Sequence, residues 1–328
     1  GEGSCEEDRC GEGDSGEGAR EEGVAREEGV AGEEGRDGEE RACEEGCAGL
    51  EASGEEGRLP GDLALSDIRY GRIVRIATWN VNSLKARLGR VEEWLADVQP
   101  DVVCLQETKL ADDAFPALAF SSLGYESAHH GQGQWNGVAI LSRVGLTEVV
   151  PGFAVGDPDP DARIITALCG RVRVSSVYVP NGRSLDHDHY QYKLRWMSQL
   201  REHVAALCAP TDDVVVAGDF NIAPTDLDVY DPKKFVGATH VSEPERASLA
   251  SLCDWGFVDL FRQHHSEGRL YSWWDYRAGD FHMGRGLRID LVLGTRSVAE
   301  HCTFSVVDRN ARKGQSPSDH APVIVDLD

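Results

Sequence analysis

The first sixty residues of the chain contain no lysine, phenylalanine, tyrosine or tryptophan. They carry 21 acidic residues against 6 arginines, a net charge of −15, together with 15 of the 36 glycines. A segment of low hydrophobicity and high like charge cannot offset the entropy of ordering its chain. We therefore expect residues 1–65 to form a disordered acidic tail and residues 66–328 to form one globular domain.

This tail repeats a loose Glu-Glu-Gly theme, as in "REEGVAREEGVAGEEG", without the apolar spacing of a helix or a solenoid. A solvated spacer is the simpler interpretation of such a segment. An acidic mimic of nucleic acid, or an arm that docks a partner, is the alternative. The sequence leaves both interpretations open.

The sequence also lacks any run of the ~20 apolar residues that a membrane span requires, and its N-terminus lacks the apolar region of a signal peptide. Nine cysteines are present, at irregular spacings. Cys104, Cys169 and Cys208 stand in apolar surroundings, as reduced core residues do. Cys43 and Cys47 form only a weak metal pattern, because no second pair and no histidine lies near them. A cytoplasmic protein without a membrane partner fits these features best.

Short apolar runs rich in β-branched residues alternate with helical patterns along the rest of the chain. Strands are expected at residues 72–81, 101–107, 136–142, 172–180, 213–221, 287–294 and 321–328. Helices are expected at residues 84–98, 191–208 and 243–256. Because strands outnumber helices and are mostly short and partly alternating, we predict an α/β fold in which two β-sheets pack face to face with helices outside.

Polar residues stand at the ends of these predicted strands. Asp219 and Asn221, in "GDFN", are two residues apart in an extended segment and therefore face the same side. The others are Asn80, Asn82, Glu107, Tyr178, Asp319 and His320, with Asp290 inside a further strand. Any one of them alone is most simply a turn or cap residue. Six strands that carry such groups predict a site at one edge of the sandwich.

The carboxylates of Glu107, Asp219 and Asp319 are hard oxygen ligands of the kind that Mg²⁺ or Mn²⁺ accepts. Net acidity argues against nonspecific binding of polyanions over the whole surface. It does not exclude a phosphate site, because a bound divalent metal inverts the local field.

His320 follows an acid at the lip of an apolar strand and could exchange a proton near neutral pH if a carboxylate fixes its tautomer. Asp290 has apolar neighbours and needs a partner, which either His320 or Arg288 and backbone amides could supply. Together with the neutral donors of Tyr178 and the asparagines, these residues fit metal-assisted hydrolysis of a phosphodiester.

The segment "YSWWDYR" at residues 271–277 contains four aromatic residues. Trp273 and Trp274 point to opposite sides if the segment is extended, so one can enter the core while the other lines a pocket. Aromatic surfaces beside a phosphate site grip unstacked nucleotides, although core packing is the simpler alternative. Of two weaker motifs, "GQGQWNG" at 131–137 precedes no helical pattern and is not expected to bind phosphate, and "DHDHY" at 186–190 is expected to cap a helix.

Seven motifs resemble, in order, those of exonuclease III-type apurinic/apyrimidinic endonucleases, within the endonuclease/exonuclease/phosphatase superfamily. They are "IATWNVNSLKAR", "PDVVCLQETK", "VYVPNGR", "GDFNIAPTDLDV", "SWWDYR", "GLRIDLVL" and "PSDHAPV". The resemblance runs from about residue 72 to the C-terminus and makes residues 66–328 the catalytic domain. It implies a four-layered α/β sandwich of two mixed β-sheets flanked by helices. It also implies Mg²⁺-dependent cleavage 5′ to abasic sites, with 3′-5′ exonuclease and 3′-end phosphodiesterase activity.

The resemblance implies a set of metal and water ligands. Glu107 would be the principal metal ligand, with Asn80 and Asn82 beside it. Asp219 would orient or deprotonate the attacking water. Asn221 would contact the scissile phosphate next to the metal.

A second set would complete the phosphate site. Tyr178 would contact the scissile phosphate, and Asp319 would assist the metal or the leaving oxygen. His320, held by Asp290, would lie beside the metal and the phosphate. Whether Asp219 or the His320–Asp290 pair acts as the base stays open.

The resemblance places the pocket for a flipped sugar at Trp273, Leu287 and Ile289. Leu287 stands where some relatives have a second tryptophan. Asn181, from "VYVPNGR", and Arg163 are expected to contact the substrate.

The expected partner is double-stranded DNA with abasic sites or blocked 3′ ends, bound by a monomer associated with the nucleoid. A superfamily phosphatase that acts on small or lipid head-group phosphates is the alternative. "SWWDYR" and "YVPNGR" favour DNA, because a head-group enzyme has no use for an aromatic wedge. An idle interaction protein is disfavoured, since every motif position holds a competent residue.

Overall fold

The computed structural model describes residues 74–277 and 279–328. The acidic tail predicted for residues 1–65 lies outside the described residues, as do Cys43 and Cys47. The helices and strands below all belong to the region that follows it.

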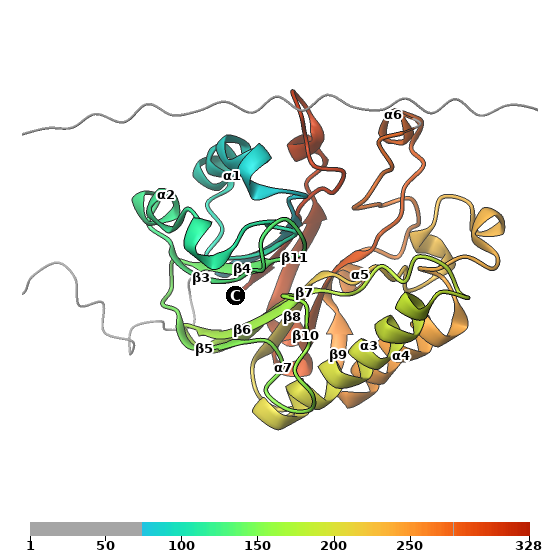
Figure 1. Ribbon diagram of the computed structural model, residues 1–328, viewed down its shortest axis with the longest axis horizontal. Helices are drawn as coiled ribbons and strands as arrows, with labels where there is room; N and C mark the ends of the chain where they lie inside the picture. Colours follow the sequence, from blue (N-terminus) through green and yellow to red (C-terminus); the bar gives the residue numbers. More distant parts are fainter. Residues whose placement is uncertain (1–73, 278) are drawn as a thin grey trace, which may run out of the picture. The chain divides into compact units, whose positions relative to one another are not determined.

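Two six-stranded sheets form the centre of the domain (Figure 1). The first has the order β11-β12-β1-β2-β4-β3 and comprises β1 (Val74–Asn80), β2 (Val102–Gln106), β3 (Glu126–His130), β4 (Val138–Ser142), β11 (Cys302–Val307) and β12 (Val323–Leu327). The second has the order β5-β6-β7-β8-β10-β9 and comprises β5 (Thr147–Pro151), β6 (Ile164–Cys169), β7 (Val172–Tyr178), β8 (Val214–Asp219), β9 (Phe257–Asp259) and β10 (Asp290–Thr295). Each sheet is mixed, because β1 and β2, and likewise β7 and β8, run parallel while the other pairs are antiparallel.

Helices cover the outer faces of both sheets (Figure 1). These are α1 (Leu84–Val98) and α2 (Ala117–Ser122) on the first sheet, and α3 (Asp188–Leu207) and α4 (Glu243–Trp255) on the second. The short helices α5 (Leu260–His264) and α7 (Arg296–His301) contribute side chains to the core between the sheets, and α6 (Asp280–Met283) belongs to a loop. One apolar cluster joins α1 to the first sheet, and another joins α3 and α4 to the second. The predicted four-layered α/β sandwich is therefore confirmed.

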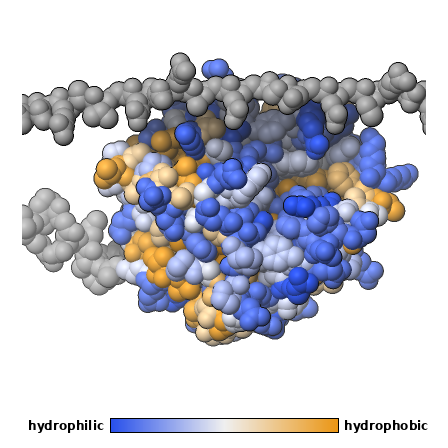
Figure 2. Space-filling model, viewed as in Figure 1, coloured by the Kyte–Doolittle hydropathy of each residue, from blue (hydrophilic) through white to orange (hydrophobic). Residues whose placement is uncertain are grey.

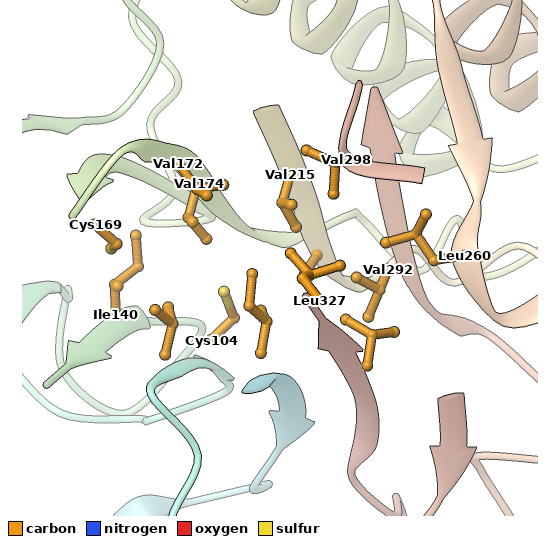
Figure 3. Packing of buried hydrophobic residues seen from close by; sticks show 14 of the residues in the cluster. Cys104, Ile140, Cys169, Val172, Val174, Val215, Leu260, Val292, Val298 and Leu327 are labelled. Carbon is orange, nitrogen blue, oxygen red and sulfur yellow. The ribbon is translucent and has the colours of Figure 1, made fainter. Parts of the chain in front are cut away.

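Alternation along the strands produces these layers. In β8, Val215 and Ala217 enter the core between the sheets, whereas Val214 and Val216 face α3 and α4. Successive side chains of a strand point to opposite faces, so a strand with both faces covered is apolar throughout. Figure 3 shows the inter-sheet core, where Cys104 of one sheet and Val215 of the other take part in the same cluster.

The three predicted helices are confirmed as α1, α3 and α4, and each of the seven predicted strands overlaps an observed strand. The strands β3, β5, β6, β9 and β11 were missed. β3 and β5 are sheet edges of five residues whose side chains are mostly half-buried or exposed, so their alternation is weak.

Smaller expectations are also confirmed. Residues 131–137 lead into β4 rather than into a helix, and His187 caps α3 by accepting a hydrogen bond from the backbone N–H of His189 at 2.9 Å. Cys104 and Cys169 are buried free thiols, and Cys208 is a half-buried one.

No helix among the described residues has the length and apolarity needed to cross a bilayer. The face shown in Figure 2 alternates hydrophilic areas with smaller apolar patches. That pattern is ordinary for a domain that buries most of its large apolar side chains.

Candidate active site

A cavity of about 180 Å³ opens where the ends of both sheets meet. Its lining residues are Glu107, Tyr178, Asn181, Asp219, Asn221, His240, Trp273, Ile289, Asp319 and His320. Six of the ten are residues expected at strand ends: Glu107, Tyr178, Asp219, Asn221, Asp319 and His320. The central expectation, that distant segments converge on one edge of the sandwich, is thus confirmed as geometry.

Strand register accounts for this convergence. Asp219, at the end of β8, lies opposite Tyr178 at the end of the parallel strand β7. It also lies opposite Asp290, which begins the antiparallel strand β10. In the other sheet, Asn80 ends β1 opposite Gln106, and Glu107 follows directly. The parallel pairs end, and their antiparallel neighbours begin, at the same edge.

Glu107, Asp219 and His320 form a compact group of possible metal ligands. One ligand atom from each lies within 4.8 Å of the others, and no other such triad occurs among the residues described. The Nδ2 atom of Asn80 donates to Glu107 Oε1 at 2.8 Å and to Asp219 Oδ2 at 3.0 Å. A neutral amide thus holds two carboxylates of like charge side by side.

The backbone around Glu107 is held in an unusual conformation. Glu107 has φ 51°, in the left-handed region, and Lys109 has φ 52°. The N–H of Thr108 donates to Gly137 O at 3.1 Å and that of Lys109 donates to Asn136 O at 2.9 Å. Left-handed residues persist where their surroundings over-determine them, so the end of loop 131–137 fixes the turn that presents Glu107.

Asp290 pairs with His320, which is one of the two alternatives that the sequence left open. His320 Nδ1 lies 2.9 Å from Asp290 Oδ2 and 3.1 Å from Oδ1. Arg288 is excluded as the partner of Asp290, because its guanidinium binds Asp228 at 2.6 Å and Asp259 at 2.7 Å. The pairing leaves His320 Nε2 facing Asp219, 3.8 Å from its Oδ2.

Electrostatics assign the protons at this site. Burial by itself would lower the pKa of His320, but the charges of Asp290 and Asp219 outweigh it and raise the pKa to about 10. Burial raises the pKa of Asp219 to about 7, helped by Asp290 and Glu107 and opposed by His320. Burial, with the charges of Glu107 and Asp219, raises the pKa of Tyr178 well above its ordinary value. Near pH 7 the imidazole is therefore charged, the phenol is neutral and Asp219 can gain or lose a proton.

Asp319 lies at the side of the cavity, with both carboxylate oxygens engaged. Oδ1 accepts from Asn82 Nδ2 at 3.0 Å, and Oδ2 accepts from Trp273 Nε1 at 3.2 Å. Burial would raise the pKa of Asp319, but the charge of His320 and these hydrogen bonds together lower it. Asp319 falls outside the triad of Glu107, Asp219 and His320.

The two asparagines expected near the phosphate lie together. Asn181 Nδ2 donates to Asn221 Oδ1 at 3.2 Å, and Asn221 Nδ2 donates to Val179 O at 3.0 Å. Asn221 has φ 51°, and its N–H donates to Asp219 Oδ1 at 2.9 Å. The side chains of Asn221 and Asp219 are therefore set by one short turn.

Two of the residues expected to contact the substrate do not line the cavity. Leu287 is only 1% exposed and packs against Ala223, Val229 and Ile289, so it supports the cavity wall without lining it. Arg163 is 6% exposed and stacks its guanidinium 4.8 Å from the centre of the Tyr178 ring. Arg163 therefore positions Tyr178 from behind.

The adjacent tryptophans behave as the extended segment requires. Trp273 lines the cavity with Ile289, while Trp274 is buried and packs against Phe281 with ring centres 5.0 Å apart. Opposite orientations of neighbouring side chains give one tryptophan to the site and the other to the core.

The sequence analysis missed Lys109 and His240. Lys109 Nζ lies 2.9 Å from Glu107 Oε2 and donates to Asn82 Oδ1 at 2.6 Å. Its position in "LQETK", two residues after Glu107, was a usable signal. His240 lines the cavity and donates from Nδ1 to Asn221 O at 2.5 Å. It comes from an irregular segment, and no local pattern marks it.

Comparison with known proteins matches this geometry to a family. Residues 77–320 fit the Endonuclease/Exonuclease/phosphatase family. The chain belongs to this family. Exodeoxyribonuclease III of Haemophilus influenzae is 34% identical over 262 residues, which cover 76% of this chain and 98% of the relative. The resemblance drawn from the seven motifs is confirmed.

Solved structures agree with this assignment. The 3′-5′ exonuclease (NExo) from Neisseria meningitidis is 43% identical, with a TM-score of 0.76 over 78% of this chain and 100% of that one. An AP endonuclease from Archaeoglobus fulgidus is 36% identical, with a TM-score of 0.76 over 78% of this chain and 99% of that one. A protein named as an exonuclease and one named as an AP endonuclease therefore share this fold with the chain.

Proposed function

We propose that this protein is a DNA repair nuclease that hydrolyses the phosphodiester 5′ to abasic sites and also removes nucleotides and blocking groups from 3′ ends. The proposal rests on the observation that Glu107, Asp219 and His320 lie close together in one cavity. Asn80 donates hydrogen bonds to both of the acids. The relatives named as exodeoxyribonuclease III, AP endonuclease and 3′-5′ exonuclease act in this range of reactions.

The donor set fits a magnesium ion, with manganese as a substitute. Glu107 and Asp219 offer the hard oxygens, with the amide oxygens of Asn82 and Asn221 nearby. His320 fits the metal less well, because magnesium prefers oxygen ligands and the pairing of Nδ1 with Asp290 favours a charged imidazole. Asp319 lies outside the triad, and its oxygens accept hydrogen bonds from Asn82 and Trp273. When bound, the cation would neutralise charge that develops on the phosphate oxygens.

Residues of the chain supply the general base and the charged donor to the phosphate. Asp219 lies between Glu107 and His320, and in the site without a cation burial raises its pKa to about 7, so its carboxylate is basic enough to accept the proton of an attacking water. His320 carries a charge and can donate from Nε2 to a phosphate oxygen, since Asp290 occupies Nδ1. We therefore assign the base to Asp219 and the electrophilic donor to His320.

Neutral donors would orient the phosphate. The Tyr178 hydroxyl and the amide of Asn181 line the cavity and add no negative charge to that of Glu107 and Asp219. Trp273 and Ile289 supply an apolar wall against which a deoxyribose can rest. This division places the sugar on the side of Ile289 and the phosphate on the side of the acids.

We infer double-stranded DNA with abasic sites or blocked 3′ ends as the partner, acted on by a monomer in the cytoplasm at the nucleoid. The half-buried Trp273 in the cavity wall and the asparagines opposite it favour a nucleotide over a lipid head group. A phosphatase acting on small phosphates is accordingly not favoured.

A duplex with one tetrahydrofuran abasic analogue, incubated with Mg²⁺ and separately with EDTA, tests the proposal. We expect one metal-dependent nick on the 5′ side of the analogue. A second duplex with a 3′-phosphate at a nick should lose that phosphate under the same conditions. If both duplexes stay intact with Mg²⁺ or Mn²⁺, the proposed function is wrong.

A further inference from the structure

A buried ion pair lies directly behind the cavity wall. Lys193 of α3 and Glu245 of α4 place Nζ and Oε1 2.5 Å apart, and both side chains are 0% exposed. The two helices run side by side on the outer face of the second sheet (Figure 1). Burying two charges costs more desolvation than a simple apolar contact would, so the pair calls for an explanation beyond packing.

Lys193 reaches past Glu245 into the wall of the site. Its Nζ donates to Asn221 O at 2.7 Å and lies 3.3 Å from Asn181 O. The side chains of both asparagines line the cavity. The three protons of the ammonium are thus shared among one carboxylate and the backbone carbonyls of two site residues.

Glu245 accepts hydrogen bonds from residues on the opposite side of the same wall. Its Oε1 accepts from Thr239 Oγ1 at 2.7 Å and from the N–H of His240 at 2.9 Å. Its Oε2 accepts from Ser242 N at 3.0 Å and Oγ at 2.6 Å. Burial alone would raise the pKa of Glu245, but Lys193 and these donors outweigh it and lower the pKa. A charged Glu245 therefore fixes the backbone that carries His240.

Lys193 and the His240 segment that Glu245 holds both contact Asn221. Its carbonyl accepts from Lys193 and from the ring of His240, and the backbone of both Asn221 (φ 51°) and His240 (φ 75°) is left-handed. Residues other than glycine adopt this backbone conformation at an energetic cost, which neighbouring contacts have to offset. The ion pair supplies those contacts on both sides.

We propose that Lys193 and Glu245 are positioning residues that hold Asn221 and His240 in register with Asp219. This inference rests on the proposed function and adds residues that touch no substrate. If the pair only fastened α3 to α4, its removal would lower stability and leave the chemistry of correctly folded molecules unchanged. If it positions the wall, chemistry suffers in folded molecules as well.

The double variant Lys193→Met/Glu245→Gln separates these roles. Both replacements are close in shape, and removing both charges together leaves no buried charge unpaired. We expect a folded protein with a lower melting temperature, because a glutamine amide accepts through only one of the two positions at which Glu245 accepts. We also expect a kcat on abasic or 3′-phosphate duplex lower by roughly 10- to 100-fold and a KM within about threefold, because a small misplacement mainly raises the barrier.

The matched control is Arg75→Met/Asp326→Asn. This pair, with atoms 2.7 Å apart, ties β1 to β12 at the end of β1 remote from Asn80. It should retain the parent's kcat and KM. A folded Lys193→Met/Glu245→Gln protein with parental kcat would overturn the proposal.

Two further measurements keep the test decisive. If the double variant does not fold, His240→Asn takes its place, because asparagine tolerates a left-handed backbone and lacks the ring that binds Asn221 O. A parental kcat in this variant would contradict the proposal, and a tenfold loss would support it. If the parent itself cleaves no DNA, the proposed function fails, and histidine NMR decides the inference independently. The His240 ring should be the Nδ1–H tautomer in the parent and lose that preference in the double variant; an unchanged ring spectrum would contradict the inference.

Discussion

Asn80 and Asp219 join the two sheets at the site: Asn80 Nδ2, on the first sheet, donates to Asp219 Oδ2, on the second, at 3.0 Å. The same amide donates to Glu107 at 2.8 Å. One buried side chain therefore sets the distance between the two acids that would share a cation. The separation of the sheets, a property of the core, and the spacing of the ligands, a property of the site, are coupled through this residue.

Asn80→Ala should remove that coupling. Without the shared donor, two buried carboxylates face each other with less compensation, which favours protonation of one of them. We expect single-turnover cleavage to fall by about 100-fold, in the range that one lost polar contact to a developing charge costs. Rapid-quench kinetics on the abasic duplex measure the rate, and circular dichroism checks the fold. Asn82→Ala, two residues beyond the end of β1, is the matched control and should lose less.

Asp290→Asn should change how activity depends on pH. Asp290 contributes most of the attraction that raises the pKa of His320 to about 10, so its loss lowers that pKa towards the ordinary value of 6.5. The parent imidazole stays charged through neutral pH, whereas the variant imidazole loses its proton as pH rises above about 7. We expect a loss of about 100-fold at pH 8 and a smaller one at pH 6. A loss that is equal at both pH values would contradict the role given to the charged His320.

The sequence allowed the strand ends and their side chains to be predicted because both depend on local pattern. The valine run before Asp219 marks a buried strand, and "GDFN" marks its end, so Asp219 and Asn221 could be placed before any fold was known. The pairing of Asp290 with His320 needed tertiary information, because Arg288 was an equal candidate. Arg288 is excluded as the partner only because the fold brings Asp228 and Asp259 beside its guanidinium.

Other residues carry no local signal. Arg163 follows an aspartate- and proline-rich stretch and looks like a surface cation, yet the fold buries it against Tyr178. Glu245 and Lys193 lie on helices and resemble ordinary solvated charges, because nothing local tells which helix face meets a second helix. A contact between two residues 52 positions apart on different helices depends on the path of the loop and on packing, which periodicity does not record.

Glu107→Gln should weaken metal dependence selectively. The amide keeps an oxygen for the hydrogen bond from Asn80 but loses the negative charge that a divalent cation prefers. We expect the Mg²⁺ concentration for half-maximal cleavage to rise by about tenfold or more and the melting temperature to change little. A magnesium titration of cleavage measures this, after EDTA has removed bound metal. Glu126→Gln, an exposed acid on β3, should leave the magnesium curve unchanged.

Acid should destabilise the fold through buried neutral histidines, of which His203 is the clearest. Its Nδ1 accepts from the N–H of Ala154 at 2.9 Å and its Nε2 lies 2.9 Å from Thr166 Oγ1, so both nitrogens are engaged while the ring is neutral. Burial lowers the pKa of His203 to about 4, against 6.5 for the ordinary group. Between these values the unfolded chain binds the proton more readily, so the stability that His203 contributes is present above pH 6.5 and is lost as pH falls towards 4.

This difference amounts to about 3 kcal/mol of unfolding free energy for a shift of this size. Urea unfolding of the parent at pH 7.5 and pH 4.5 should show the loss, and His203→Gln, which cannot gain a proton, should be less stable at pH 7.5 yet lose less between the two pH values. The exposed His282→Gln is the control and should follow the parent at both. If His203→Gln and the parent lose equal free energy on acidification, His203 is not a source of the acid sensitivity, and carboxylates such as Glu245 and Asp228, which give up their ion pairs when protonated, would carry it instead.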